Sequence, residues 1–402
     1  MNLFYTGLGI ARSLGERGIP VIGLTAQRRT YGNFTRYASV RLSPDSRHEP
    51  YALRSYLLKL RKELVGRAIV FPTSDDDLVF LMRFRDELEQ YFTLAIAPTA
   101  ALEACLNKWE TFRWAQKAGV AAPRCWLIES EKDLLAACVE TKFPCVLKPL
   151  SSHYWHQGDN WDLVGGRKGF AVSTREELLS EYTLVARADR RVVLQDFVPG
   201  GDDSLHIAAC YLDRQSRWVA GFTAQKLAQV PTGFGTGCIV QVTKRPELFE
   251  PSIRLLQAIQ LTGIAEVEYK WDVAERVYKL IEVNPRPWDH HRLGSVANAD
   301  LIFLAYAELA GLSLPEISAR PAGQKWIAED TFFTTVLRML WRRDPGLRSF
   351  ARLARGKRVY AVWSVRDPLP FVMYVFTRFL ADLVSACFRF VRSRFTGKGS
   401  RK

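Results

Sequence analysis

Paired cysteines are absent from this sequence. Its seven cysteines are odd in number and scattered, with no C-x-x-C motif: Cys105, Cys125, Cys138, Cys145, Cys210, Cys238 and Cys387. Disulfide frameworks and structural zinc sites depend on paired or closely spaced cysteines. The sequence therefore predicts reduced thiols and a cytoplasmic protein.

An export signal, internal repeats and low-complexity linkers are also absent. Residues 1–5 lack the basic region and cleavage site of a signal peptide, so no export is expected. No Ser–His–Asp or Cys–His arrangement indicates a protein nucleophile. The chain does have 402 residues and 48% hydrophobic content, enough for a large core divided among two to four domains.

Negative charge is scarce at one end of the chain. Residues 338–402 contain 16 Lys and Arg but only three acids, so this segment carries +13 of the formal net charge of +14. The preceding 337 residues are nearly neutral. We therefore expect any contact with an anionic surface to be made by the C-terminal segment.

The N-terminal region has a strand–helix rhythm. Residues 6–14 predict a glycine-rich turn and a helix, residues 20–24 a buried strand, and residues 68–89 a second strand and helix, which together favour a small parallel sheet. The Gly7-Leu8-Gly9 turn is only a weak dinucleotide fingerprint because the third glycine is missing. A short strand at residues 3–5 looks abbreviated, so the true start is expected slightly upstream.

Two further units follow along the chain. The first has a helix at 109–118, a strand at 145–149 and, between 150 and 170, a polar segment with several glycines that is typical of a functional lid. His153 and His156 are interpreted as polar lid residues rather than metal ligands. The second runs from a strand at 192–195 to a helix near 301–310, and His290 and His291 are expected to line its substrate side or to pack.

Two acidic segments of alternating polarity lie close together in the second of these units. Residues 265–269 and 280–286 alternate apolar and polar side chains, and residues 272–276 between them are typical of a hairpin turn. On paired strands, Glu268 and Glu282 share one face. Two close carboxylates suit Mg²⁺, and Arg286 adds a fork for phosphate or carboxylate. The alternative is a surface hairpin with solvated charges.

The order of these motifs resembles a known family. Lys108, Lys148, the glycine-containing lid, the segment 195–200 and the Glu268–Arg286 hairpin together resemble the ATP-grasp superfamily, in particular its carboxylate–amine ligases, which include D-aspartate ligase. The resemblance covers residues 5–315. It implies two α+β lobes that clasp ATP (106–190 and 191–320), after a small parallel-sheet α/β domain (1–105) and before a basic, amphipathic helical tail (321–402).

The resemblance also implies roles for individual residues, with ATP and Mg²⁺ as cofactors and Mn²⁺ as an alternative metal. The implied ATP contacts are Lys108 and Lys148 to phosphates, Gln195, Asp196 and Val198 to adenine, and either Asp202 or Asp203 to ribose. The implied metal ligands are Glu268, Glu282 and Asn284. Arg286 would stabilise the transferred phosphoryl group, and Lys226 would face the γ-phosphate or the acceptor, although an exposed strand lysine is nearly as well supported.

The implied activity is an ATP-dependent ligase that forms an amide from a carboxylate and an amine through an acyl phosphate. ADP and phosphate are the expected products, and the expected partners are these small molecules and a second copy of the chain as a homodimer. The alternatives are an ATP-grasp phosphotransferase and a nucleotide-binding membrane scaffold without turnover.

The C-terminal segment predicts an amphipathic helix at residues 371–394. Arg378, Asp382, Ser385, Arg389 and Arg392 form one polar stripe, and no run of 18 uncharged residues allows a confident membrane span. Together with the basic residues from 338 onward, it predicts an interfacial helix on an anionic membrane, on the cytoplasmic side. A helix packed on the body or on a partner is the alternative. Nucleic acid is not expected as a partner, because phenylalanines on a broad apolar face do not resemble base-stacking platforms.

Overall fold

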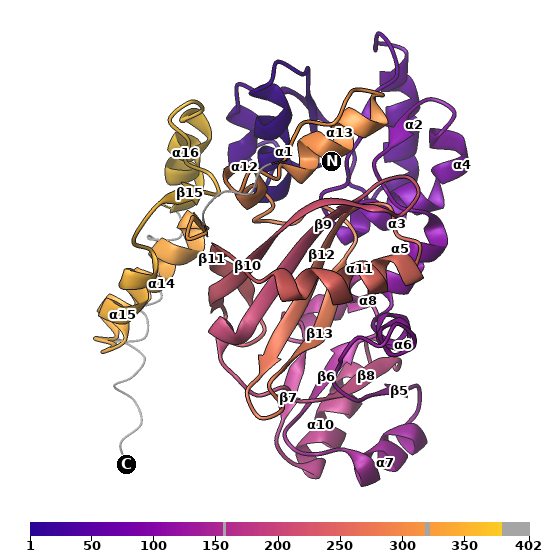
Figure 1. The fold of residues 1–402 in the computed structure, drawn as a ribbon, viewed down its shortest axis with the longest axis vertical. Coiled ribbons are helices and arrows are strands. Elements are labelled where there is room, and N and C mark those ends of the chain that lie inside the picture. Colours follow the sequence, from indigo (N-terminus) through magenta and orange to yellow (C-terminus); the bar gives the residue numbers. More distant parts are fainter. Residues whose placement is uncertain (156–157, 318–321, 380–402) are drawn as a thin grey trace.

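The computed structural model describes residues 1–155, 158–317 and 322–379. Figure 1 shows a large central sheet, with a smaller sheet and its helices at one end, the N-terminal unit at the other end, and the C-terminal helices beside the central sheet. Within the described ranges no helix is long and apolar enough to cross a membrane.

The N-terminal unit carries four short strands in two separate parallel pairs, β1–β2 and β3–β4. Its elements are α1 (Tyr5–Gly15), β1 (Ile22–Thr25), the 3₁₀ turn η1 (Tyr31–Phe34), β2 (Ser39–Leu42), α2 (Pro50–Arg61), β3 (Ile69–Val70), α3 (Asp75–Arg83), α4 (Arg85–Leu88), β4 (Thr93–Leu94) and α5 (Thr99–Leu106). The parallel pairing expected from the sequence is present, but in two small sheets instead of one.

The expected turn at Gly7 and Gly9 is wrong, because both glycines lie inside helix α1, and residues 3–5 form no strand. Close packing explains these glycines. A Cβ on Gly9 would lie 2.7 Å from Nε2 of His291, and one on Gly7 would lie 1.6 Å from the carbonyl oxygen of Asn2. The helix thus approaches the loop after the Glu268/Glu282 hairpin closely enough to exclude any side chain at position 9.

The smaller lobe is a four-stranded antiparallel sheet in the order β5-β8-β6-β7. Its elements are α6 (Lys108–Lys117), β5 (Cys125–Ile128), α7 (Glu131–Glu140), β6 (Cys145–Pro149), α8 (Ser152–Trp155), α9 (Asn160–Leu163), β7 (Phe170–Val172), α10 (Arg175–Val185) and β8 (Val192–Asp196). The expected helix and strands are present. The lid is not a continuous loop, since the short helices α8 and α9 interrupt it; His156 lies outside the described residues.

The central sheet has seven strands in the order β13-β12-β9-β10-β11-β14-β15. Its first five strands and their neighbours are η2 (Asp202–Ser204), β9 (Leu205–Leu212), β10 (Trp218–Val230), β11 (Thr236–Thr243), η3 (Pro246–Leu248), α11 (Phe249–Ala258), β12 (Gly263–Asp272), β13 (Val277–Asn284), α12 (Leu293–Val296) and α13 (Leu301–Leu309). Ala265, Val267 and Tyr269 alternate onto the face that packs on α5, α6 and α11. The acidic residues between them therefore lie on the opposite face.

The C-terminal residues differ from the expected helical tail. They form β14 (Lys325–Ile327), α14 (Glu329–Trp341), α15 (Leu347–Leu353), β15 (Arg358–Tyr360), α16 (Leu369–Tyr374) and the π-helical turn η4 (Val375–Phe379). Strands β14 and β15 extend the central sheet beyond β11, so the sheet continues past residue 320. Three-residue strands are too short to show a period-two pattern. Of the predicted helix at 371–394, residues 380–394 lie outside the described residues.

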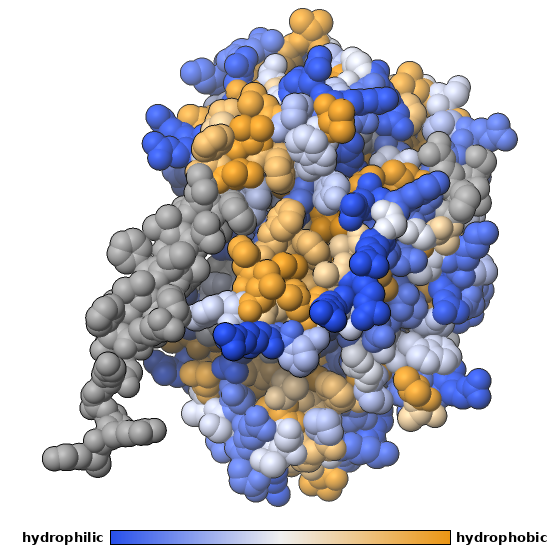
Figure 2. All heavy atoms as spheres, turned by 90° about the vertical axis from the view of Figure 1, so that its left-hand side faces the viewer, coloured by the Kyte–Doolittle hydropathy of each residue, from blue (hydrophilic) through white to orange (hydrophobic). Residues whose placement is uncertain are grey.

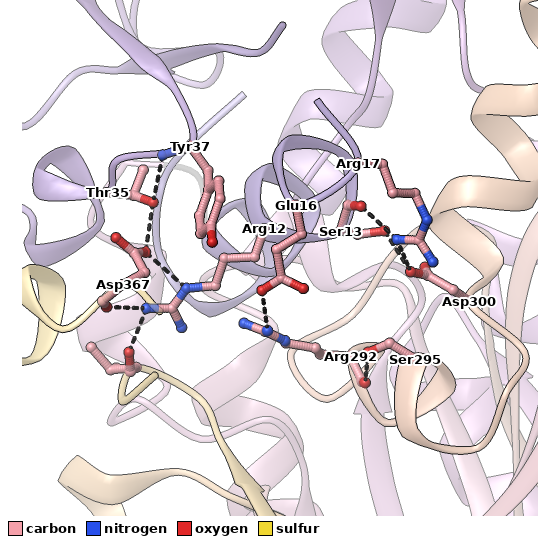
Figure 3. Close-up of polar contacts among 11 residues, drawn as sticks. Arg12, Ser13, Glu16, Arg17, Thr35, Tyr37, Arg292, Ser295, Asp300 and Asp367 are labelled. Carbon is pink, nitrogen blue, oxygen red and sulfur yellow. Dashed lines mark hydrogen bonds and ion pairs between the residues drawn. The ribbon is translucent and has the colours of Figure 1, made fainter. Parts of the chain in front are cut away.

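A buried ion pair holds this C-terminal segment to helix α1. Arg12 donates from Nε to Oδ2 of Asp367 at 2.9 Å and from Nη2 to the carbonyl oxygen of Val362 at 2.7 Å. Asp367 also accepts from the hydroxyl of Thr35 at 2.7 Å. Figure 3 shows Arg12 pointing toward Asp367, with Glu16 of the same helix paired to Arg292. The first helix of the chain is thus tied both to the last described segment and to the loop after β13.

Candidate active site

A cavity of about 550 Å³ lies where the two sheets and the N-terminal unit meet. The smaller lobe contributes Lys108, Lys148, Gln195 and lid residues such as Ser152 and Lys168; the central sheet contributes Lys226, Glu266, Glu268, Glu282 and Asn284; the N-terminal unit contributes Thr73, Ser74 and Asp75. A volume of this size is typical of small-molecule sites. Most sequence-predicted site residues therefore line one space.

Two buried lysines face the cavity from the smaller lobe. Lys108 begins helix α6, whose N-cap Asn107 accepts a hydrogen bond from the backbone of Glu110, and its Nζ donates to Oγ of Ser152 at 3.3 Å. Lys148 lies in the apolar strand β6, where Nζ donates to Oε1 of Gln195 at 3.1 Å. Burial, and then the nearby charge of Lys108, lowers the pKa of Lys148 to about 8. This end of the cavity is suited to bind an anion.

The predicted pairing of the two carboxylates is confirmed by the strand register. Glu268 lies opposite Glu282 and Glu266 lies opposite Asn284, with a β-bulge at Ile281. Burial raises the pKa of Glu282, but four lysines, Lys108, Lys148, Lys168 and Lys226, together lower it more, to about 2. Glu282 is therefore ionised at neutral pH, with Nζ of Lys108 3.9 Å from its Oε2.

Lys226 pairs with the second carboxylate. Its Nζ lies 2.7 Å from both Oε1 and Oε2 of Glu268. Burial lowers the pKa of Lys226, but Glu268 and Glu266 raise it by more than burial lowers it, so the lysine stays charged. The alternative of an exposed strand lysine is thus wrong, since the side chain is buried against the acidic wall.

Glu266 belongs to the same wall, although the sequence-based site omitted it. Its Oε2 accepts a hydrogen bond from Nδ2 of Asn284 at 3.0 Å, and its Oε1 lies 2.9 Å from Nε2 of His290 without the alignment of a hydrogen bond. Burial raises the pKa of Glu266 to about 7. Its position two residues before Glu268 on the same strand was the available signal, because residues i and i+2 share a face. His290 lines the cavity as expected, whereas His291 packs against Thr6 with 3.0 Å between Nε2 and the carbonyl oxygen.

Arg286 is positioned from the N-terminal unit. Its Nε donates to Oδ1 of Asp75 at 2.6 Å, and Asp75 stands in the first turn of α3, whose N-cap Ser74 accepts a hydrogen bond from the backbone of Asp77. Burial lowers the pKa of Arg286, but Asp75 raises it well above its usual range. Asp75 comes from a segment more than 200 residues away in sequence, so no local motif could indicate it.

The two polar residues of strand β8, Gln195 and Asp196, lie on opposite faces of the sheet. Gln195 and Val198 are buried and line the cavity, as expected. The side chain of Asp196 does not, because successive strand residues point to opposite faces. Its Oδ2 instead accepts a hydrogen bond from Nε of Arg124 at 2.7 Å. The predicted adenine contact of Asp196 would therefore be made by its backbone.

Of the two neighbouring aspartates, Asp202 lines the cavity and Asp203 lines a separate groove. Asp202 accepts hydrogen bonds from the backbone of Gln229 at 2.9 Å and of Gly233 at 3.0 Å. It thereby orders the glycine-rich turn between β10 and β11. On the lid side, Nζ of Lys168 donates to Oγ1 of Thr236 at 3.0 Å, which joins the lid to this turn across the cavity.

The donors present fit a hard divalent cation. Because Nδ2 of Asn284 is used by Glu266, its Oδ1 is the atom left for the cavity, beside the carboxylates of Glu268 and Glu282. No three His, Cys, Asp or Glu side chains within the described ranges form a metal-binding group. Mg²⁺ does not require one, because it is commonly held by one or two carboxylates together with substrate phosphates.

Sequence comparison finds ligases. At 23% identity over 299 residues, spanning 71% of this chain and 69% of the relative, the chain is similar to a D-aspartate ligase from Enterococcus faecium (strain Aus0004). It is also 23% identical over 209 residues to a D-alanine–D-alanine ligase from Pseudomonas entomophila (strain L48), spanning 48% of this chain and 59% of that relative. No family model matches the chain.

Structural comparison finds nucleotide complexes of the same fold. The ADP complex of N5-carboxyaminoimidazole ribonucleotide synthetase matches with a TM-score of 0.63 at 15% identity, over 84% of this chain and 83% of that chain. Biotin carboxylase from Campylobacter jejuni, in complex with an ATP ligand, matches with a TM-score of 0.62 at 17% identity, over 80% of this chain and 73% of that chain.

Proposed function

We propose that this ATP-grasp enzyme, a C–N ligase that uses ATP, joins the carboxylate of one small molecule to the amine of another through an acyl phosphate. The fold, the ligase class and the use of ATP predicted from the sequence are confirmed by the ligase relatives and the ADP-bound structural neighbours. The acyl-phosphate route, the metal and the residue roles are the proposal.

One observation carries the proposal. Lys108 and Lys148 from the smaller lobe face Glu268, Glu282 and Asn284 across a single cavity that Arg286 also lines. Cations at one wall and ionised carboxylates at the other suit a polyphosphate that arrives with a divalent cation. A hairpin with solvated charges would not enclose them in this way.

In this proposal the smaller lobe binds the nucleotide. Lys108 and Lys148 contact its phosphates, the amide of Gln195 and the backbone near Val198 contact adenine, and Asp202, which lines the cavity, is preferred over Asp203 for ribose. The lid, joined to the glycine-rich turn through Lys168 and Thr236, excludes water. Exclusion of water matters because an exposed acyl phosphate hydrolyses.

Transfer then takes place at the acidic wall. Glu268, Glu282 and Asn284 would hold Mg²⁺, which would supply positive charge beside the nucleotide phosphates. A substrate carboxylate oxygen attacks the γ-phosphorus, the bond to the β-phosphate oxygen breaks, and ADP leaves. Arg286, held by Asp75, stabilises charge on the transferred group, and Lys226 faces the same place. The amine next attacks the acyl carbon, and phosphate leaves as the amide forms and the amine loses a proton.

The names of the relatives suggest the first substrates to test. Both are named for ligation of a D-amino acid. We include a D-amino acid as acid or amine in the proposal, and we place the enzyme in the cytoplasm, at the membrane surface discussed below.

The experiment is a substrate screen with purified full-length protein, Mg²⁺ and ATP. D-amino acids and other carboxylates are paired with amines while ADP and phosphate are measured. Equal release of ADP and phosphate that requires both substrates supports the ligase. Production of AMP, or of a stable phosphorylated alcohol without free phosphate, contradicts it. Glu282→Gln should abolish the activity, whereas Glu176→Gln, exposed on α10 and outside the cavity, is the matched control and should keep it.

A further inference from the structure

Helix α14 turns an apolar face outward. Phe333, Leu337 and Leu340 have 40%, 40% and 53% of their surface exposed. Their spacing of four and three residues places them on one side of a helix. The neighbouring Phe332 packs instead on the body, stacked on Phe350 at 5.5 Å. The helix is therefore anchored by one side and displays hydrophobic residues on another.

Exposed apolar side chains are also frequent in the last described residues. Val365, Leu369, Val372 and Phe376 are 82%, 50%, 39% and 65% exposed. Residues 322–379 hold nine of the twenty exposed large hydrophobic side chains in the described ranges. Such clustering marks an interaction surface, since scattered single residues would need no explanation. Figure 2, which faces this side of the molecule, shows a hydrophobic area bordered by hydrophilic side chains.

Exposed positive charge is frequent in the same segments. Between residues 338 and 366 nine Lys and Arg side chains are all exposed: Arg338, Arg342, Arg343, Arg348, Arg352, Arg355, Lys357, Arg358 and Arg366. The one acid in the same stretch, Asp344, is exposed, whereas Asp367, just beyond it, is buried in its pair with Arg12. Glu329 is also buried, and its carboxylate accepts hydrogen bonds from the backbone of Val362 and Trp363. The exposed charge is thus almost entirely cationic.

We propose that this apolar–basic surface, formed by the exposed side chains of residues 333–376, docks on an anionic lipid membrane. Exposed hydrophobic residues and exposed arginines on the same segments suit insertion among lipid headgroups together with attraction to anionic ones. A symmetric contact between two copies of the chain would instead bring like charges together. The inference does not depend on the ligase chemistry, and it assigns the contact to folded elements, α14 and α16, rather than to residues 380–394.

Co-sedimentation of the full-length protein with vesicles tests the proposal. Binding is expected to vesicles of phosphatidylcholine with phosphatidylglycerol, to fall at least tenfold with phosphatidylcholine alone, and to weaken as salt is raised, because salt screens the arginines. Leu337→Glu combined with Leu340→Glu should lower binding at least tenfold. Val139→Glu is the matched control: Val139 is 85% exposed on α7 and lies outside the surface, so binding should be unchanged.

Other outcomes would overturn the assignment. Unaltered binding of the Leu337/Leu340 variant, or an absence of binding by the wild type, contradicts it. A dimer measured by light scattering that the same double substitution abolishes, without vesicle binding, would identify a second copy as the occupant. Melting curves are needed to check that the variants are folded. ADP release, measured without vesicles, tests the proposed ligase activity separately.

Discussion

Lys226, which is buried, and Glu268, which is largely buried, form an ion pair in which one ammonium lies 2.7 Å from both carboxylate oxygens. The lysine neutralises a carboxylate that would otherwise be unpaired when no cation is bound. Burial raises the pKa of Glu268, so its ionised form depends on such a partner. The pair explains how an acidic wall can be stable before substrate arrives.

Removal of Lys226 should therefore destabilise the free protein. We expect Lys226→Met to lower the free energy of unfolding by about 3 kcal/mol, because a buried carboxylate is left without its partner. Urea denaturation of the single variants and of Lys226→Met/Glu268→Gln measures the coupling. The double variant should recover most of the loss; additive losses would contradict the pairing.

Lys148 should make ATP binding depend on pH. Its pKa of about 8 means that it loses its proton as the pH rises through 8, and the charged form is the one that binds phosphate. We expect the Kd for ATP to increase between pH 7 and 9.5. Calorimetry with wild type and Lys148→Met measures this: the variant should bind roughly 10–100-fold more weakly at pH 7, as loss of a charge-assisted hydrogen bond predicts, and with a flatter profile. An equally steep profile in the variant would contradict the role of Lys148.

Asp75 should affect catalysis more than nucleotide binding. Asp75→Asn weakens the contact that orients Arg286, so we expect kcat to fall by about 10–100-fold while the KM for ATP changes little. Steady-state ADP release measures both constants. The control is Asp86→Asn, exposed on the next helix α4, which should leave both unchanged.

The ion pair between Arg12 and Asp367 should be important for stability. Arg12→Met leaves a buried carboxylate, and we expect a loss of about 3–5 kcal/mol in the free energy of unfolding. Arg12→Met/Asp367→Asn should be more stable than Arg12→Met alone. Thermal and urea unfolding of the three variants check this, and equal stability of Arg12→Met and wild type would rule out a structural role.

The sequence predicted what depends on local pattern. Alternation predicted that Glu268 and Glu282 share one face of paired strands, and the apolar strand around Lys148 indicated that this lysine is buried. Contacts between distant segments were not predictable: Asp75 reaches Arg286, and Arg12 reaches Asp367, across hundreds of residues. Short elements were missed for a different reason, since β14 and β15 have three residues each. Gly9 was misread because a glycine needed for close packing has the same signature as one in a turn.

The link between Arg12 and Asp367 also has a consequence for synthesis of the chain. The two residues are 355 positions apart, so helix α1 emerges from the ribosome long before the carboxylate that neutralises its buried guanidinium. N-terminal units commonly fold first during translation. Here the buried guanidinium of Arg12 lacks its partner until residue 367 has emerged. We expect nascent chains that end before residue 367 to leave α1 open to protease, and this sensitivity should disappear in nascent chains long enough to expose residue 367.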